Sequence, residues 1–189
     1  MSDTQPLVLG ALVGSLRTGS VHRALFEHAA AAAPDGVDLR EIPIADLPFF
    51  NQDLEGPDGP ASVRSFQDAV GEIDGLVIFT PEYNAGVPAV TKNAIDWASR
   101  PRGAAPIQDL PVLIVAATPG RHEVENVRRA LTHTAASAGA RVHERSLGLA
   151  SITRRLEDET GALELVAELR ASLIDFVDFI GVGSPPSDD

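Results

Sequence analysis

Three short runs of uninterrupted apolar residues limit the folds open to this chain more than any other feature of its sequence. They occupy residues 7–13, 76–79 and 112–117. A strand that is buried on both faces has this pattern, and such strands are typical of parallel sheets covered by helices on either side. Each run is followed closely by glycine or proline, so each predicted strand ends at a turn.

The segments between these runs complete a regular alternation of strands and helices. Residues 37–42 and 140–145 have the pattern of two further strands. Such alternation produces right-handed crossovers and a parallel sheet with helices on both faces. The sequence therefore predicts an α/β fold with a doubly wound, five-stranded parallel sheet in three layers. The predicted helices cover residues 20–33, 62–73, 87–98, 123–138 and 163–180.

One domain is expected from the length and composition. The chain has 189 residues, of which 44% are hydrophobic, and this suits a single core. We expect the domain to cover residues 1–181, and residues 182–189, rich in Gly, Pro, Ser and Asp, to form a flexible tail. The N-terminal residues lack the features of a signal peptide, and no apolar run is long enough to cross a membrane. A cytoplasmic protein is therefore expected.

Charge and cysteine content narrow the classes of function. The net charge of -12 argues against nucleic acid and anionic membranes as partners. The absence of cysteine excludes disulfides, zinc–thiolate sites, iron–sulfur clusters and thiol catalysis. The five histidines lack the spacing of a metal site, so no metal is expected. Any redox chemistry must then come from a bound cofactor.

Three distinctive loops follow the three apolar strands. They are residues 14–20 (GSLRTGS), 80–84 (TPEYN) and 118–121 (TPGR). In doubly wound sheets, ligands bind beyond the carboxyl ends of the strands. The three loops should therefore meet at one edge of the sheet and form one site.

The first loop has the components of a phosphate site. Its glycines allow main-chain N–H groups to approach an anion, Ser15 and Ser20 add hydroxyl groups, and Arg17 adds a cation at a helix N-terminus. The alternative is an ordinary turn in which Ser20 only caps the helix. The loop lacks the lysine of a P-loop, and the glycines lack the spacing of a dinucleotide fingerprint.

The second loop is suited to hold a flat ligand. Pro81 restricts the backbone where the strand ends, and Tyr83 and Asn84 offer polar side chains beside it. The alternative is a plain proline turn. Tyr83, the only tyrosine, is expected to be exposed.

Together, these motifs resemble the NADPH-dependent FMN reductase family, which includes bacterial quinone, chromate and azo-dye reductases. The likeness rests on residues 14–20, 80–84 and 92–97 (KNAIDW), in that order. It implies a flavodoxin-like fold, FMN as cofactor, NADPH or NADH as reductant, a small electron acceptor, and a homodimer or homotetramer. By the family pattern, the phosphate of FMN is held by Ser15, Arg17, Ser20, Val21 and His22. The isoalloxazine ring is lined by Pro81, Glu82, Tyr83 and Asn84. The pyrimidine side of the ring is touched by Thr118, Pro119 and Gly120.

The sequence departs from that pattern at two places. His22 stands where the family usually has asparagine, and a histidine there could still donate to phosphate. Arg121, His122 and Glu123 follow Gly120 where the family often has a glycine pair. Bulkier residues could narrow the acceptor site, or Arg121 could stabilise negative charge on the reduced flavin.

Two features outside the loops have open interpretations. Trp97 is either a core residue or part of a subunit interface or pocket wall, and the helix over residues 87–98 is expected to contribute to a dimer. Asp175 and Asp178 are expected to lie on a solvated helix face.

The expected function is electron transfer from a nicotinamide cofactor through FMN to a small acceptor. The two substrates would enter the same space in turn, a ping-pong scheme that needs no catalytic acid or base from the protein. The acceptor could be a quinone, an azo or nitro compound, a metal oxyanion or free flavin. The alternatives are a non-enzymatic flavin electron carrier and a regulatory protein that kept only the fold.

Overall fold

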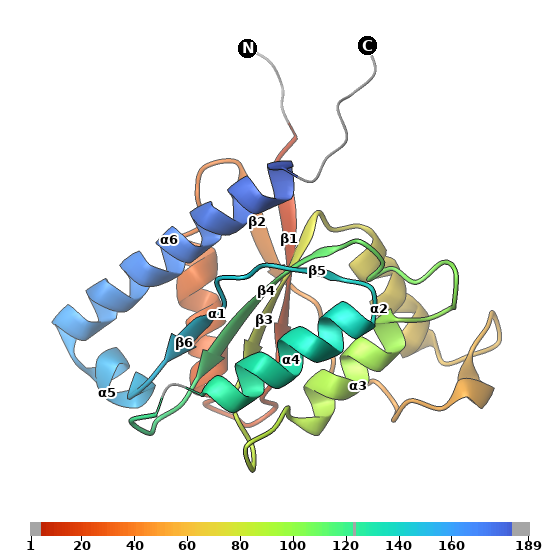
Figure 1. The fold of residues 1–189 in the computed structure, drawn as a ribbon, viewed down its shortest axis with the longest axis horizontal. Helices are drawn as coiled ribbons and strands as arrows, with labels where there is room; N and C mark the ends of the chain where they lie inside the picture. Colours follow the sequence, from red (N-terminus) through yellow and green to blue (C-terminus); the bar gives the residue numbers. More distant parts are fainter. Residues whose placement is uncertain (1–4, 123, 183–189) are drawn as a thin grey trace.

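The computed structural model describes residues 5–122 and 124–182, and these form a parallel sheet between two layers of helices (Figure 1). The strands follow the order β2-β1-β3-β4-β5, and β6 also pairs with β4. Every pairing is parallel, as the continuous apolar runs predict. The strands are β1 (Leu7–Val13), β2 (Val37–Glu41), β3 (Gly75–Thr80), β4 (Pro111–Ala117), β5 (Arg141–Val142) and β6 (Leu147–Leu149).

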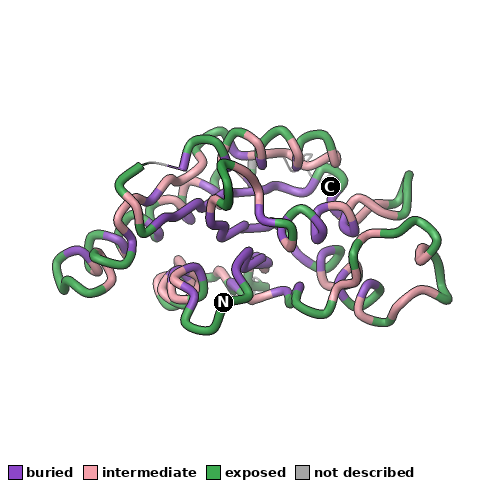
Figure 2. The backbone as a smooth tube through the Cα atoms, turned by 90° about the horizontal axis from the view of Figure 1, so that it is seen from below, coloured by how far each residue is buried: buried purple, intermediate pink, exposed green. Residues whose placement is uncertain are grey.

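The helices divide between the two faces of the sheet. Side chains of α1 (Val21–Ala31) and α6 (Glu159–Val182) pack with one set of strand residues, whereas α2 (Ala61–Gly71), α3 (Ala89–Ala98) and α4 (Glu125–Ser137) pack with the other. The short α5 (Ile152–Glu157) lies next to α6, and a 3₁₀ turn, η1 (Gln52–Leu54), interrupts the segment between β2 and α2. Figure 2 shows the buried backbone running between exposed outer layers. The predicted three-layer α/β architecture is confirmed.

The register of the central strands aligns their carboxyl ends. Val13 of β1 pairs with Phe79 of β3, and Thr80 of β3 pairs with Ala116 of β4. The three loops that follow these strands therefore leave the sheet at the same edge, as the sequence predicts.

The fifth strand differs from the prediction. Instead of one strand over residues 140–145, β5 and β6 pair separately with the two ends of β4. Between them, the buried side chain of His143 lies with its Nε2 atom 3.2 Å from the Asp175 carboxylate, which also accepts a hydrogen bond of 2.9 Å from Arg145. Asp175 is partly exposed, with 35% of its side chain accessible, but its carboxylate also ties α6 to the sheet edge, which the prediction of a solvated face does not include. Asp178 is exposed, as expected.

The sequence predicts a flexible tail over residues 182–189 and no membrane-spanning segment. Val182 is the last residue of α6, and the remainder of the predicted tail, residues 183–189, lies outside the described residues. Within the described part of the chain, no helix combines the length and apolar character needed to span a membrane.

Candidate functional site

The first loop joins β1 to α1 and leaves several main-chain donors available. Ser20 is the N-cap of α1, since its Oγ accepts a hydrogen bond of 3.2 Å from the His22 N–H. Ser20 and Ser15 are both buried, so their hydroxyl groups lie at this edge of the sheet. Arg17 is exposed and donates to the Gly19 carbonyl at 3.1 Å. Within the described residues, no hydrogen bond is donated by the main-chain N–H groups of Ser15, Leu16, Arg17, Thr18, Gly19 and Val21.

These free donors lie around the positive end of α1. A row of unpaired N–H groups beside a helix N-terminus forms an anion-binding concavity. Gly19 contributes a left-handed turn, with φ of 69°, and open space around its Cα atom. The first loop therefore has the N-cap that the simple-turn alternative expects, together with free main-chain donors of the kind that bind anions.

His22 is placed differently from the other residues of the loop. Its imidazole is buried, and Nε2 donates to the Ala117 carbonyl at 3.1 Å, because a carbonyl oxygen can only accept. Burial lowers the pKa of His22 to about 4 despite that hydrogen bond, so the ring is neutral at pH 7. The side chain thus ties α1 to the end of β4, and the N–H group of His22 belongs to the N-cap.

The second loop contains a tight hairpin turn. Tyr83 and Gly86 exchange two main-chain hydrogen bonds of 3.1 and 3.0 Å, and the residues between them, Asn84 and Ala85, have positive φ. This is the geometry of a type I′ turn, which is rigid. The Tyr83 side chain is 52% exposed, as expected, and its hydroxyl lies 3.4 Å from Ser15 Oγ. The first and second loops are therefore in contact.

The side chain of Glu82 points to a neighbouring helix. Its carboxylate accepts a hydrogen bond of 3.1 Å from the N–H of Val127 in the first turn of α4. The N-cap of α4 is Val124, which has φ of 49° and no capping side chain. This role of Glu82 was not predicted, although the lack of Ser, Thr, Asp or Asn directly before α4 is a signal that its cap comes from elsewhere.

The third loop is fixed by main-chain hydrogen bonds to the segment before α5. Thr118 O accepts from Ile152 N at 3.0 Å, and Gly120 O accepts from Ser151 N at 2.6 Å. Thr118 Oγ1 accepts from Gly120 N at 3.0 Å and so closes the turn around the exposed Pro119. Next to this loop, the bond between His22 and Ala117 joins the start of α1 to the end of β4.

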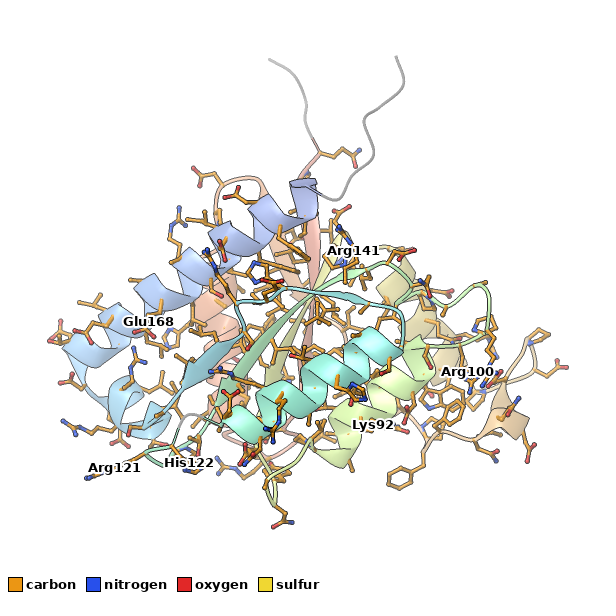
Figure 3. The ribbon with its side chains drawn as sticks, in the orientation of Figure 1. Lys92, Arg100, Arg121, His122, Arg141 and Glu168 are labelled. Carbon is orange, nitrogen blue, oxygen red and sulfur yellow. The ribbon has the colours of Figure 1, made fainter. Side chains whose placement is uncertain are left out.

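The residues after Gly120 occupy the outer rim of the site. A Cβ atom on Gly120 would lie 2.9 Å from Cε1 of His122, so the imidazole packs directly over this glycine. Arg121 and His122 are exposed and extend from the loop beyond β4 (Figure 3). Glu123 lies outside the described residues. The rim thus carries the guanidinium of Arg121 and the imidazole of His122.

The third motif of the resemblance has a structural role. Lys92 and Asp96 form an exposed ion pair on α3, with nitrogen and oxygen 2.6 Å apart. Asn93 and Trp97 bond to the main chain of residues 48–50 instead. The Trp97 side chain has no exposed surface, so its interpretation as a core residue is confirmed and its interpretation as an interface residue was wrong.

Known proteins with related sequences are quinone and FMN reductases. The chain is 36% identical over 117 residues to a quinone reductase of Pseudomonas putida, and the aligned part covers 62% of this chain and 63% of that protein. It is 39% identical over 114 residues to an NAD(P)H-dependent FMN reductase of Pseudomonas aeruginosa, covering 60% of each. A 2-hydroxy-1,4-benzoquinone reductase of a Burkholderia species is 42% identical over 97 residues, covering 51% of this chain and 52% of that one. The chain therefore matches less than two thirds of the length of these relatives.

Solved structures share the whole fold. The flavoenzyme NAD(P)H:(acceptor) oxidoreductase FerB from Paracoccus denitrificans superposes with a TM-score of 0.80 at 29% identity, covering 93% of this chain and 98% of that one. An azoreductase of Bacillus anthracis in complex with FMN has a TM-score of 0.59 at 14% identity, covering 93% and 98%, and supports the fold alone. The sequence model described as NADPH-dependent FMN reductase matches residues 8–153, which include all three loops. This chain therefore belongs to the NADPH-dependent FMN reductase family.

Proposed function

We propose that this protein is an FMN-dependent oxidoreductase that transfers electrons from NADPH or NADH to a small acceptor. The observation that carries the proposal is that three loops leave the sheet at one edge, where the first loop presents unpaired N–H groups around a helix N-terminus. Because the chain belongs to the NADPH-dependent FMN reductase family, we expect these loops to bind FMN.

The first loop suits the phosphate of FMN. Its free main-chain N–H groups, the hydroxyl groups of Ser15 and Ser20 and the guanidinium of Arg17 are all hydrogen-bond donors, and an anion accepts from such groups. Val21 would contribute its main-chain N–H group, whereas the N–H and the imidazole of His22 are already bonded to Ser20 Oγ and the Ala117 carbonyl. Because one anion site is present and no second phosphate motif follows, we expect FMN in preference to FAD.

The second and third loops suit the flavin ring. The hairpin at residues 83–86 and the turn at residues 118–120 each keep their shape through internal hydrogen bonds. Main-chain groups of Pro81, Glu82 and Asn84 and of Thr118, Pro119 and Gly120 are therefore held in place before a ligand arrives. Such preorganisation lowers the free-energy cost of orienting a flat ring.

The chain itself orients its ligands and supplies charge rather than acid–base chemistry. FMN, when bound, supplies a ring that takes two electrons from a reduced nicotinamide and passes them to an acceptor. His22 is neutral and engaged with Ala117, and Glu82 is engaged with α4, so neither side chain is free to transfer a proton to substrate. A ping-pong sequence, in which the oxidised nicotinamide leaves before the acceptor enters, is the scheme that we propose, because it needs no catalytic acid or base from the chain.

Quinones are the acceptor class that we favour. The relatives from Pseudomonas putida and the Burkholderia species are named as reductases of quinones. Arg121 and His122 at the rim of the site suit a substrate that carries or gains negative charge. Azo and nitro compounds, metal oxyanions and free flavin are the other acceptors to be compared. We also propose that the protein acts as a homo-oligomer, with a dimer as its basic unit.

The test is an anaerobic titration of the purified protein after loading with FMN. We expect a yellow protein whose flavin absorbance is bleached by NADPH or NADH and restored by benzoquinones, with turnover in their presence. A flavin that stays oxidised with both nicotinamides would instead support a flavin electron carrier. Failure to take up FMN would support a regulatory protein that has lost the cofactor.

A further inference from the structure

His22 is a buried polar residue that lies directly behind the loops of the proposed FMN site. Only 3% of its surface is exposed, although it follows the first loop closely, in the first turn of α1. Its Nε2 atom donates to the Ala117 carbonyl, at the end of β4, over 3.1 Å. The main chain of Thr80, at the end of β3, also interacts with the ring and opposes the effect of burial on the pKa of His22. The imidazole thus contacts the ends of the two strands from which the second and third loops leave the sheet.

The first loop keeps its shape through bonds that do not use the His22 side chain. The Ser20 N–H donates to the Arg17 carbonyl at 3.1 Å, and the Arg17 guanidinium donates to the Gly19 carbonyl at 3.1 Å. The Ser20 hydroxyl accepts from the main-chain N–H of His22 at 3.2 Å. Another side chain at position 22 would leave all three bonds in place, so the anion-binding turn is preformed by itself.

The third loop is likewise held by bonds of its own. The Gly120 N–H donates to Thr118 Oγ1 at 3.0 Å, and the Gly120 carbonyl accepts from the Ser151 N–H at 2.6 Å. Neither bond involves α1. The proposed phosphate and ring sites are therefore two preformed halves, and their separation depends on whatever connects them.

His22 supplies the buried connection between the two halves. The Gly14 N–H donates to β3 at 2.7 Å, and residues 15–20 then leave the sheet. Within the described residues, the other side-chain hydrogen bond from this segment to a later loop joins Ser15 Oγ and the Tyr83 hydroxyl, which are 3.4 Å apart. That contact is long for a bond between hydroxyl groups, and the tyrosine is 52% exposed. The shorter, buried bond of His22 is therefore the firmer of the two connections.

We propose that His22 is a positioning residue that sets the spacing between the site for the FMN phosphate and the site for the flavin ring. One FMN molecule has to reach both sites, so it gains the full benefit of both only when they are held at the correct separation. The ring of His22 is neutral at pH 7, so it acts through its hydrogen bond and not through charge. This inference rests on the proposed function and assigns a role to a side chain that does not itself touch the cofactor.

The first test removes the donor at position 22 without changing the charge. His22→Leu and His22→Met place apolar side chains of similar size there, and the unbranched methionine adapts to an irregular space if leucine prevents folding. Both variants should raise the dissociation constant of FMN about tenfold, since the buried Ala117 carbonyl loses its donor. Inorganic phosphate fills one half of the site and riboflavin the other, so each should bind almost as it does to the wild type. Isothermal titration calorimetry at pH 7 measures the three ligands.

The second test separates spacing from stability with a rescue variant and a control. His22→Gln carries an uncharged amide N–H donor at about the reach of the imidazole Nε2, so it should restore FMN affinity and the visible circular dichroism of the bound flavin. His143→Leu is the matched control, because this buried histidine lies at the other end of β4, with its N–H on the Val112 carbonyl and its Nε2 3.2 Å from the Asp175 carboxylate. It should lower the free energy of unfolding in urea and leave FMN affinity unchanged.

The possible outcomes distinguish this inference from the proposed function. A wild-type protein that takes up no FMN would overturn both. A wild-type protein that binds FMN, with unchanged affinity in a folded Leu or Met variant, would overturn the spacing role alone. Equal losses of FMN and inorganic phosphate would do the same, since His22 would then shape the phosphate site itself. A folded His22→Gln protein that binds FMN as weakly as the apolar variants would also contradict the role of the hydrogen bond.

Discussion

The carboxylate of Glu82 caps the N-terminus of α4 through a hydrogen bond of 3.1 Å from the Val127 N–H. The two residues are 45 positions apart in the chain. This contact connects the loop after β3, where the flavin ring is proposed to lie, to the helix that begins after the third loop. Glu82 is therefore a positioning residue whose side chain acts at a distance from the ring.

Replacing Glu82 with Ala should destabilise the protein and loosen the second loop. Loss of a capping acceptor costs about 0.5–2 kcal/mol of unfolding free energy, and loss of its charge near the helix N-terminus adds to this. FMN affinity should fall severalfold. Glu125→Ala, which removes a charge from the same turn of α4 but no contact with the loop, should lower stability without lowering FMN affinity. Urea unfolding and flavin fluorescence measure the two effects, and an unchanged FMN affinity in Glu82→Ala would show that the tether is irrelevant to the cofactor.

Arg17 should contribute to cofactor affinity rather than to turnover. A hydrogen bond to a charged group is worth about 1.5–3 kcal/mol, so Arg17→Ala should weaken FMN binding by roughly one to two decades. Riboflavin lacks the phosphate, and its weaker binding should hardly change. At saturating FMN, turnover should remain near that of the wild type.

A matched control for Arg17 lies six residues later, in the first turn of α1. Arg23 carries the same charge, but its guanidinium is paired with the Glu41 carboxylate at 2.6 and 2.8 Å. Arg23→Ala should leave FMN affinity nearly unchanged. Equal losses of FMN and riboflavin binding in Arg17→Ala would mean that Arg17 supports the loop and does not contact the phosphate.

His22 should make the protein less stable in mild acid. Its pKa is about 4 in the folded state and 6.5 as a model value, so between these pH values the unfolded chain binds more protons. The contribution of His22 to stability is complete above pH 6.5 and is lost as the pH falls towards 4, by up to about 3 kcal/mol. His22→Asn should flatten this part of the profile, as measured by urea unfolding at pH 5 and pH 7.5. A slope identical to that of the wild type would contradict the assignment.

Gly14 should tolerate no larger residue while Thr91 is present. A Cβ atom at position 14 would overlap Thr91 Oγ1 and lie 3.2 Å from the Phe79 carbonyl. Gly14→Ala should therefore cost about 1–3 kcal/mol of stability, the usual cost of overpacking. Thr91→Ala removes the obstructing hydroxyl, so the double variant should be more stable than the sum of the single effects by about 0.5–3 kcal/mol. Strict additivity in urea unfolding would show that the two residues do not collide.

The sequence alone determined the layers, the parallel sheet and the edge at which the site lies. Residues 7–13, 76–79 and 112–117 are apolar at every or nearly every position, and this local pattern requires burial on both faces. The first loop, residues 14–20, combines glycines, serines and Arg17 within seven residues, and this composition alone indicates an anion site. Burial pattern and loop composition depend on residues that are close together in the sequence, so they can be predicted from the sequence.

Only the tertiary structure decided what the individual side chains contact. The partner of Glu82 is 45 residues away, that of His22 is 95 away, and Trp97 bonds to a carbonyl 49 residues earlier. The division of the fifth strand likewise accompanies contacts of His143 and Arg145 with Asp175, 30 and more residues later. These partners are selected by the packing of helices on the sheet, and no local pattern encodes which side chains that packing brings within hydrogen-bond distance.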